Sequence, residues 1–110
     1  MADTLKVLGQ VAPANTSNAD LYTVPEDTQT TVSSLVACNL TGNTPSFRVA
    51  VRPLGATVAS EHYIYYDKAL AANDSVFIII GITLSDDDVI TIRSSAADEI
   101  AFTLFGVETS

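Results

Sequence analysis

Apolar and polar residues alternate with a period of two along much of this chain, and this alternation limits the fold more than any other feature. In residues 46–52, "SFRVAVR", the apolar residues Phe47, Val49 and Val51 occupy alternate positions. Successive side chains of a strand point to opposite faces, so the pattern is typical of a strand buried on one face. No window carries a helical stripe with capping residues. The sequence therefore predicts an all-β protein.

Clusters of turn-forming residues separate the alternating runs. Examples are "TGNTP" from Thr41 and "SDDD" from Ser85, whose residue types tolerate the backbone angles of turns. Many short strands at near-regular spacing are typical of an antiparallel β-sandwich, here expected to be jelly-roll-like. About eight strands are expected, at residues 4–11, 20–24, 29–40, 46–53, 61–70, 75–82, 88–94 and 99–107.

The 110 residues predict a single domain spanning 1–110, with a short N-terminal arm at 1–10. The single cysteine, Cys38, excludes an internal disulfide framework. In an extended segment Cys38 shares a face with Val36 and Leu40, so we expect a small buried apolar side chain there.

Acidic residues outnumber basic residues by 13 to five, which gives a formal charge of -8. Nucleic-acid-binding surfaces need a basic patch, and docking on anionic lipid needs basic segments, so neither partner is expected. The N-terminus lacks the apolar segment of a signal peptide, and no stretch has the length of a membrane-spanning helix.

Candidate catalytic and metal-binding groups are few. His62 is the only histidine and has no nucleophile signature around it, so we expect a surface or interface residue. Asp86, Asp87 and Asp88 offer carboxylates to calcium, but their spacing differs from the known calcium loop. A turn between two strands is predicted there, with a weak surface calcium site as the alternative. We expect no enzyme activity, catalytic residue, metal site or cofactor.

Several polar positions are expected to have structural roles. The glycosylation sequons at Asn15, Asn39 and Asn73 are interpreted as turn residues, since no secretion signal accompanies them. Gly81 and Gly106 lie inside strand patterns, which indicates bulges or bends. The remaining group consists of three arginines, expected either to pair with carboxylates or to contact an acidic partner: Arg48, Arg52 and Arg93.

The segment 75–84, "SVFIIIGITL", has apolar residues on both faces. Alternation places Val76, Ile78 and Ile80 on one face. Phe77, Ile79 and, with a bend at Gly81, Ile82 then lie on the other. Residues 100–107, "IAFTLFGV", repeat the feature. A strand in contact with water on one face should carry polar residues there, so both faces of these strands are expected to be covered.

A domain of this size has little material to lie over the second face of these strands. A soluble monomer rarely exposes a large apolar patch, so another protein surface is the expected cover. The chain is then a homo-oligomer, as a dimer or trimer, or it docks on a larger assembly. A closed jelly roll with a thick core is the competing explanation. The expected interface residues are Phe77, Ile79, Phe105 and Val107, with Leu5 and Val7 from the N-terminal segment.

The sequence resembles a family of small virion structural proteins of tailed phages, of the cyanophage type. The similarity covers about residues 5–108 and is most specific in four blocks. The resemblance implies a non-enzymatic particle component on the capsid exterior or in the tail. The blocks are "LYTVP" at 21–25, "FRVAVRP" at 47–53, "EHYIYYD" at 61–67 and the "AND…GITL…DDVITI" run from Ala72.

The resulting functional expectation is a capsid decoration, or cement, protein that stabilises the head by binding the major capsid protein or other virion proteins. Such a protein is made in the host bacterial cytoplasm and ends in the virion. The alternative is a tail or neck fibre or receptor-binding module, in which Tyr63 and Tyr65, expected to share a strand face, stack on a host glycan. A jelly-roll enzyme is disfavoured because such metal enzymes need several histidines.

Overall fold

A computed structural model describes residues 3–110, except the side chain of Ile80. Its eight strands fall within about two residues of the predicted ones, and two short 3₁₀ turns, η1 (Pro53–Gly55) and η2 (Ser60–His62), lie between β4 and β5. The all-β prediction is confirmed. The strands are β1 (Asp3–Val11), β2 (Ala19–Thr23), β3 (Gln29–Asn39), β4 (Ser46–Arg52), β5 (Tyr63–Ala69), β6 (Ser75–Leu84), β7 (Val89–Ser94) and β8 (Ile100–Thr109).

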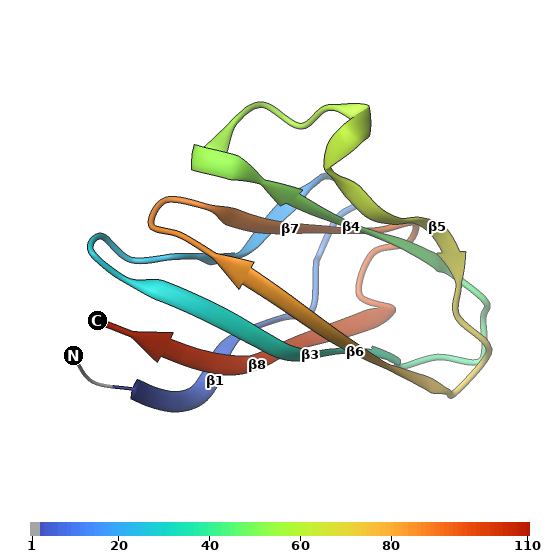
Figure 1. The fold of residues 1–110 in the computed structure, drawn as a ribbon. Coiled ribbons are helices and arrows are strands. Elements are labelled where there is room, and N and C mark those ends of the chain that lie inside the picture. The colour runs from blue at the N-terminus through green and yellow to red at the C-terminus, as the bar shows by residue number, and fades with distance from the viewer. Residues whose placement is uncertain (1–2) are drawn as a thin grey trace.

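The strands form two four-stranded antiparallel sheets that face each other (Figure 1). The first sheet has the order β1-β8-β3-β6, and the second has the order β2-β7-β4-β5. The first strand pairs with the last, the second with the seventh, the third with the sixth and the fourth with the fifth. This nested pairing across two sheets is the topology of a jelly roll, as the sequence predicted.

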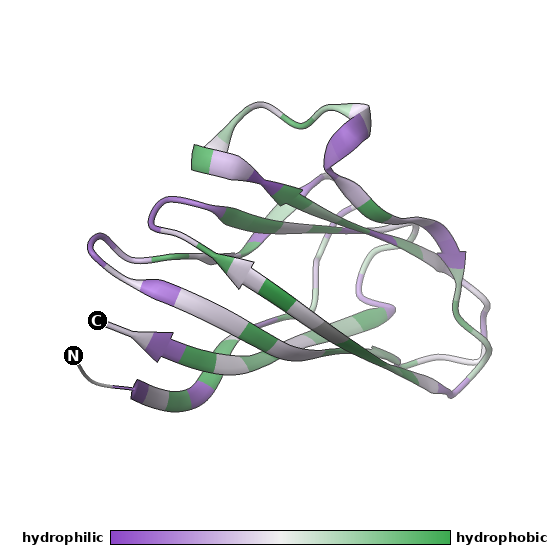
Figure 2. Ribbon diagram, in the orientation of Figure 1, coloured by the Kyte–Doolittle hydropathy of each residue, from purple (hydrophilic) through white to green (hydrophobic). Residues whose placement is uncertain are grey.

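The core lies between the two sheets and is built from the inward residues of both. Figure 2 shows hydrophobic and hydrophilic residues alternating along several strands. Phe47 of the second sheet meets Phe102 of the first, edge to face, with ring centroids 5.9 Å apart. The predicted inward set Phe47, Val49 and Val51 is confirmed, because the first two are buried and the third packs against them. The two sheets therefore supply most of the core, and Val24 and Leu70, each directly after a strand, complete it.

The two glycines predicted to mark bulges or bends, Gly81 and Gly106, lie at irregular points of the first sheet. The pairing of β3 with β6 and with β8 shifts register between Val32 and Ser34. Gly106 pairs with Val32 beside this shift, and a methyl group there would collide with the carbonyl oxygen of Thr31. Gly81 lies in the same shift but has open space around it. Both glycines therefore lie at an irregularity where the sequence predicted bulges or bends, and the extra residue relative to β8 belongs to β3.

The bulge in β3 corrects the prediction for Cys38. An extra residue moves every later side chain to the opposite face. Val32 is buried, but Val36 and Cys38 lie on the outside of the first sheet and are only partly buried, and Leu40 is exposed. Val36, Cys38 and Leu40 therefore do not face the core, and the expectation of a buried Cys38 was wrong.

Three further predictions of orientation or order were wrong. Register shifts between β4 and β5 turn Tyr65 into the core, while Tyr63 contacts Tyr66 instead of sharing a face with Tyr65. Ile82 packs against the core and not beside Phe77, because strict alternation continues through Gly81. The residues expected to form an N-terminal arm form the strand β1 instead, which pairs with β8 from Asp3 to Val11. Residues 1–2 and the side chain of Ile80 lie outside the described part.

Candidate protein-binding face

The outer side of the first sheet, here called the outer face, brings together all six predicted interface residues. Val7 of β1 lies beside Phe105 of β8, and Phe105 lies beside Ser34 of β3, which in turn pairs with Ile79 of β6. The adjacent rows place Leu5 beside Val107 and Val36 beside Phe77. Residues from both ends and the middle of the chain therefore form one continuous surface.

Four large apolar side chains of the outer face extend into solvent. Ile79 is 87% exposed, Leu5 80% and Phe77 71%, and Val7 is also exposed. Phe105, at the centre of the sheet, retains 36% exposure, and Val107 is half-buried. The subunit itself therefore does not cover these residues. Their role in an interface remains a prediction.

The outer face is also free of charge over nearly all of its area. β3 and β6 contain no charged residue. Lys6 of β1 and Glu108 of β8 pair with each other at 3.2 Å, and Glu108 also accepts a hydrogen bond from the hydroxyl of Tyr22 in the second sheet. These charges thus lie at the rim between the sheets. Asp3 is at one corner of the face, where Thr109 donates to it. A protein of charge -8 therefore has one neutral, apolar side.

The opposite side of the molecule, the outside of the second sheet, carries charged residues. Arg48 Nε donates to Asp67 Oδ1 at 2.7 Å, and Arg52 Nη1 donates to Asp20 Oδ1 at 2.8 Å. The prediction that these arginines pair with carboxylates is confirmed. Arg93 instead donates to the carbonyl oxygen of Thr16 at 2.7 Å. The connection through η1 and η2 lies beside β4 (Figure 1), where Ala50 is buried despite its outward position.

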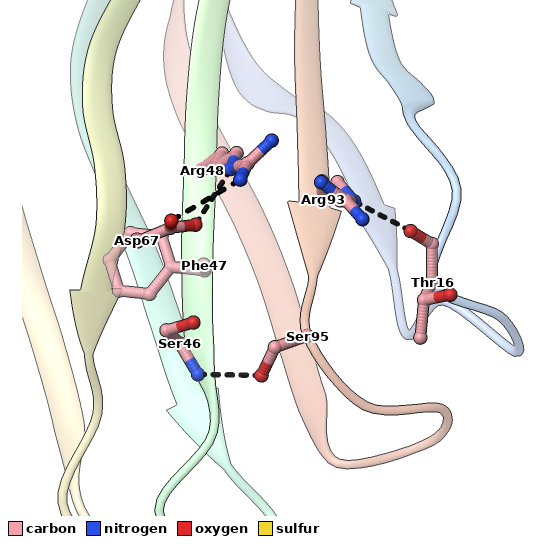
Figure 3. Close-up of a pocket in the computed structure, with 7 residues that line it drawn as sticks. All are labelled: Thr16, Ser46, Phe47, Arg48, Asp67, Arg93 and Ser95. Atoms are coloured by element: carbon pink, nitrogen blue, oxygen red, sulfur yellow. Dashed lines mark hydrogen bonds and ion pairs between the residues drawn. The ribbon is translucent and has the colours of Figure 1, made fainter.

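A hollow of about 380 Å³ opens between Arg48 and Arg93, which are paired neighbours on β4 and β7 (Figure 3). The hydrogen bond from Arg48 and its charge, and then the charge of Arg93, lower the pKa of Asp67 below its usual value. Asp67 therefore stays ionised and compensates the guanidinium charge from within the protein. Arg48 also lies 3.9 Å above the ring of Tyr66. The charged side chains that line the hollow therefore have their hydrogen-bond partners within the protein.

The other candidate residues have local structural contacts. His62 Nδ1 accepts a hydrogen bond from the backbone N–H of Ala59 and helps to close the η2 turn. Asp88 accepts from the backbone N–H groups of Ser85 and Leu54, so it fixes the β6–β7 turn. Among residues 3–110, no group of three or more His, Cys, Asp or Glu side chains is placed to hold a metal ion.

The three sequon asparagines lie in or directly beside turns, as predicted. Asn15 Oδ1 accepts from the backbone N–H of Ser17, and Asn73 adopts a left-handed backbone with φ of 56°. Asn39 is buried and has the most contacts. Its Nδ2 donates to three backbone carbonyl oxygens, and its Oδ1 accepts from the backbone and hydroxyl of Thr41. Asn39 therefore connects the 39–43 and 70–71 loops at one end of the sandwich.

The hydrogen bond between Tyr22 and Glu108 connects the two sheets. The Glu108 carboxyl titrates at acid pH and the Tyr22 hydroxyl at alkaline pH. The hydrogen bond from Tyr22 lowers the pKa of Glu108, and desolvation by burial, followed by Glu108 itself, raises the pKa of Tyr22. Tyr22 also exchanges a hydrogen bond with Thr30 at 2.8 Å. The contact is therefore strongest when Glu108 is ionised and Tyr22 is neutral.

We expect Glu108→Gln to flatten the acid limb of the stability profile. The contribution of Glu108 is fully present above the usual glutamate pKa, near 4.5, and is lost as the pH falls through the lower folded value. The Tyr22 contribution is present below about pH 10 and is lost at higher pH. Urea unfolding between pH 2 and 7 measures the acid limb. An unchanged pH slope in the variant would contradict the assignment.

The comparisons with known proteins concern the fold. No protein-family model matches the chain, and no curated protein matches it in sequence. A chain in the solved structure of infectious bursal disease virus, Gx strain, is similar to this chain with a TM-score of 0.54. The identity is 10%, over 97% of this chain and 32% of that one. The likeness shows a shared fold.

A structure of the Gt strain of the same virus also matches, with a TM-score of 0.45 at 10% identity, over 96% of this chain and 32% of that one. The present chain therefore spans about a third of the length of each matched chain. Over the described residues, no helix has the length and apolar character needed to cross a membrane.

Proposed function

We propose that this protein is a structural component of a virus particle, and that it decorates the outside of a tailed-phage capsid. The observation that carries the proposal is the outer face, which is continuous, apolar and uncharged in a strongly acidic protein. An exposed apolar patch of this kind marks a protein-binding surface. The fold shared with a chain in a solved virus structure supports a virion role.

The mechanism of decoration is burial of the outer face against the major capsid protein. Each large apolar side chain that is fully buried stabilises the contact by about 1.5 to 3 kcal/mol. Leu5, Phe77 and Ile79 have the most exposed area to lose. The second sheet then faces solvent, and the formal charge of -8 on the whole protein disfavours contact with packaged DNA. The protein acts by binding and carries out no catalysis.

Particles with and without the protein test this function. We expect mass spectrometry of purified particles to find hundreds of copies per particle. Heating should release DNA from particles that lack the protein at a temperature several degrees lower than from complete particles, and purified protein added back should restore the difference. Unchanged heat release together with absence of the protein from heads would contradict a decorating role.

A tail or neck fibre or receptor-binding module is the second candidate, and one observation favours it. Tyr66 is 59% exposed, and its ring contacts Tyr63 edge to face at 5.0 Å. Exposed aromatic rings of this kind can stack on a sugar. Copy number separates the two candidates, because a tail module is present in a handful of copies per particle. Binding of host glycans by the purified protein would then favour the tail.

A further inference from the structure

The two sheets have four edge strands, and only one of them is unprotected. An edge strand presents unpaired backbone groups to other chains, and natural proteins protect such edges with charged residues or proline. β1 carries Asp3 and Lys6, β2 carries Asp20, and β5 carries Asp67 and Lys68. β6 pairs with β3 on one side only, and its ten residues include no charge and no proline.

We propose that β6 pairs with β6 of a second copy of this chain, antiparallel about a two-fold axis, so that the two first sheets form one eight-stranded sheet. A two-fold contact must be self-complementary. β6 meets this condition because it has no charge to repel its own copy, although each subunit carries a charge of -8. The backbone hydrogen bonds of a joined edge provide the attraction, as in other strand additions.

One register fits the side chains of the outer face. If Ile79 lies opposite the partner's Ile79, then Phe77 lies opposite the partner's Gly81. A Cβ atom placed on Gly81 has no neighbour within 4 Å, so there is open space above this glycine. An aromatic ring covers a glycine of this kind on a neighbouring strand. The register would bury Phe77, which is 71% exposed in the single subunit.

The pairing would also give the outer face enough area to form a stable interface with the capsid. This argument rests on the proposed function. At strand spacings near 4.8 Å and about 3.3 Å per residue, the four strands of nine to eleven residues present roughly 19 by 33 Å, or about 630 Å². A stable interface buries about 800 Å² per partner. Two joined faces present about 1,260 Å² and exceed that value, whereas one face does not.

Charge variants at two matched positions test the pairing. We expect sedimentation to show a dimer for the unchanged protein. Ile79→Lys should raise the dissociation constant by at least about tenfold, since like charges directly opposite are destabilising. Leu5→Lys is the control, because Leu5 is exposed to a similar degree on the same face but belongs to the opposite edge strand. It should leave the dimer unchanged. A mixture of Ile79→Lys and Ile79→Glu should form heterodimers.

A cysteine pair gives an independent measurement. In a Cys38→Ser background, oxidised Ile79→Cys should form a disulfide-linked dimer, and Leu5→Cys should not. A monomer at all concentrations, or a dimer equally sensitive to Leu5→Lys and Ile79→Lys, would overturn the edge pairing. Such a result is distinct from failure of the proposed function, since attachment to particles is measured separately with the Leu5 and Val7 variant described below.

Discussion

Serine at both Leu5 and Val7 is expected to release the protein from the virus particle without unfolding it. The two side chains are 80% and 46% exposed on β1, so the folded subunit loses little when they are shortened. If the outer face binds the capsid, both become buried there, and their loss weakens attachment by about 2 to 4 kcal/mol. That energy corresponds to a rise in the dissociation constant of roughly 30- to 700-fold.

The matched control places the same substitutions on the other side of the molecule. Leu54 and Ile64 are 76% and 41% exposed and lie outside the first sheet. Leu54→Ser with Ile64→Ser removes a similar exposed apolar area but should leave attachment unchanged. Co-sedimentation of each variant with particles that lack the protein provides the measurement. Equal loss of attachment in both double variants would show that the outer face is not the contact.

Among the substitutions proposed for this protein, Asn39→Asp is expected to give the largest loss of stability. The Asn39 amide nitrogen lies 2.7 Å from the carbonyl oxygen of Asn43, 3.0 Å from that of Ala71 and 3.3 Å from that of Leu70. Aspartate has the same shape but has no donor, and it would place a charge against three carbonyl oxygens. Since each unsatisfied buried group costs about 1 to 3 kcal/mol, we expect the free energy of unfolding to fall by about 3 to 5 kcal/mol.

Chemical denaturation at several pH values tests this expectation. Burial and the three carbonyl oxygens raise the folded-state pKa of the new carboxyl group, so the loss should shrink as the pH falls through that raised value and be smallest below about pH 4, where the group is protonated and regains a donor. Asn15→Asp is the control, because Asn15 is exposed and only accepts a hydrogen bond, which a carboxylate also does. Similar stability losses at positions 15 and 39 would mean that the buried asparagine network is not essential to the fold.

The sequence predicted strand positions well because they depend on local alternation and turn chemistry. Each strand's apolar side faces the core over a run of residues, so one strand such as 46–52 is recognisable in isolation. The exposed apolar residues were predicted for the same reason. Phe77 and Ile79 interrupt an alternation that should have placed polar residues there, and the structure exposes both.

The errors arose where a bulge changes the face of later residues. Little in "TTVSSLVACNL" marks the extra residue near Ser33, because the bulge is fixed by pairing with two neighbouring strands at once. The same applies to Tyr63 and Tyr65, which irregular pairing with β4 separates. Sequence reasoning therefore missed Val36 as part of the outer face. An unusual pair of consecutive serines, Ser33 and Ser34, was the only local signal.

The central position of β8 determines when the protein can fold during synthesis. β1 has no strand neighbour in its sheet other than β8, and β8 separates it from β3. Residues 100–109 must therefore leave the ribosome before this sheet can close, and a nascent chain ending earlier exposes β3 and β6 without their partner. Contacts between such distant segments form slowly. We thus expect the first sheet to close only after β8 has been synthesised, with the uncharged β6 strand exposed to aggregation until then.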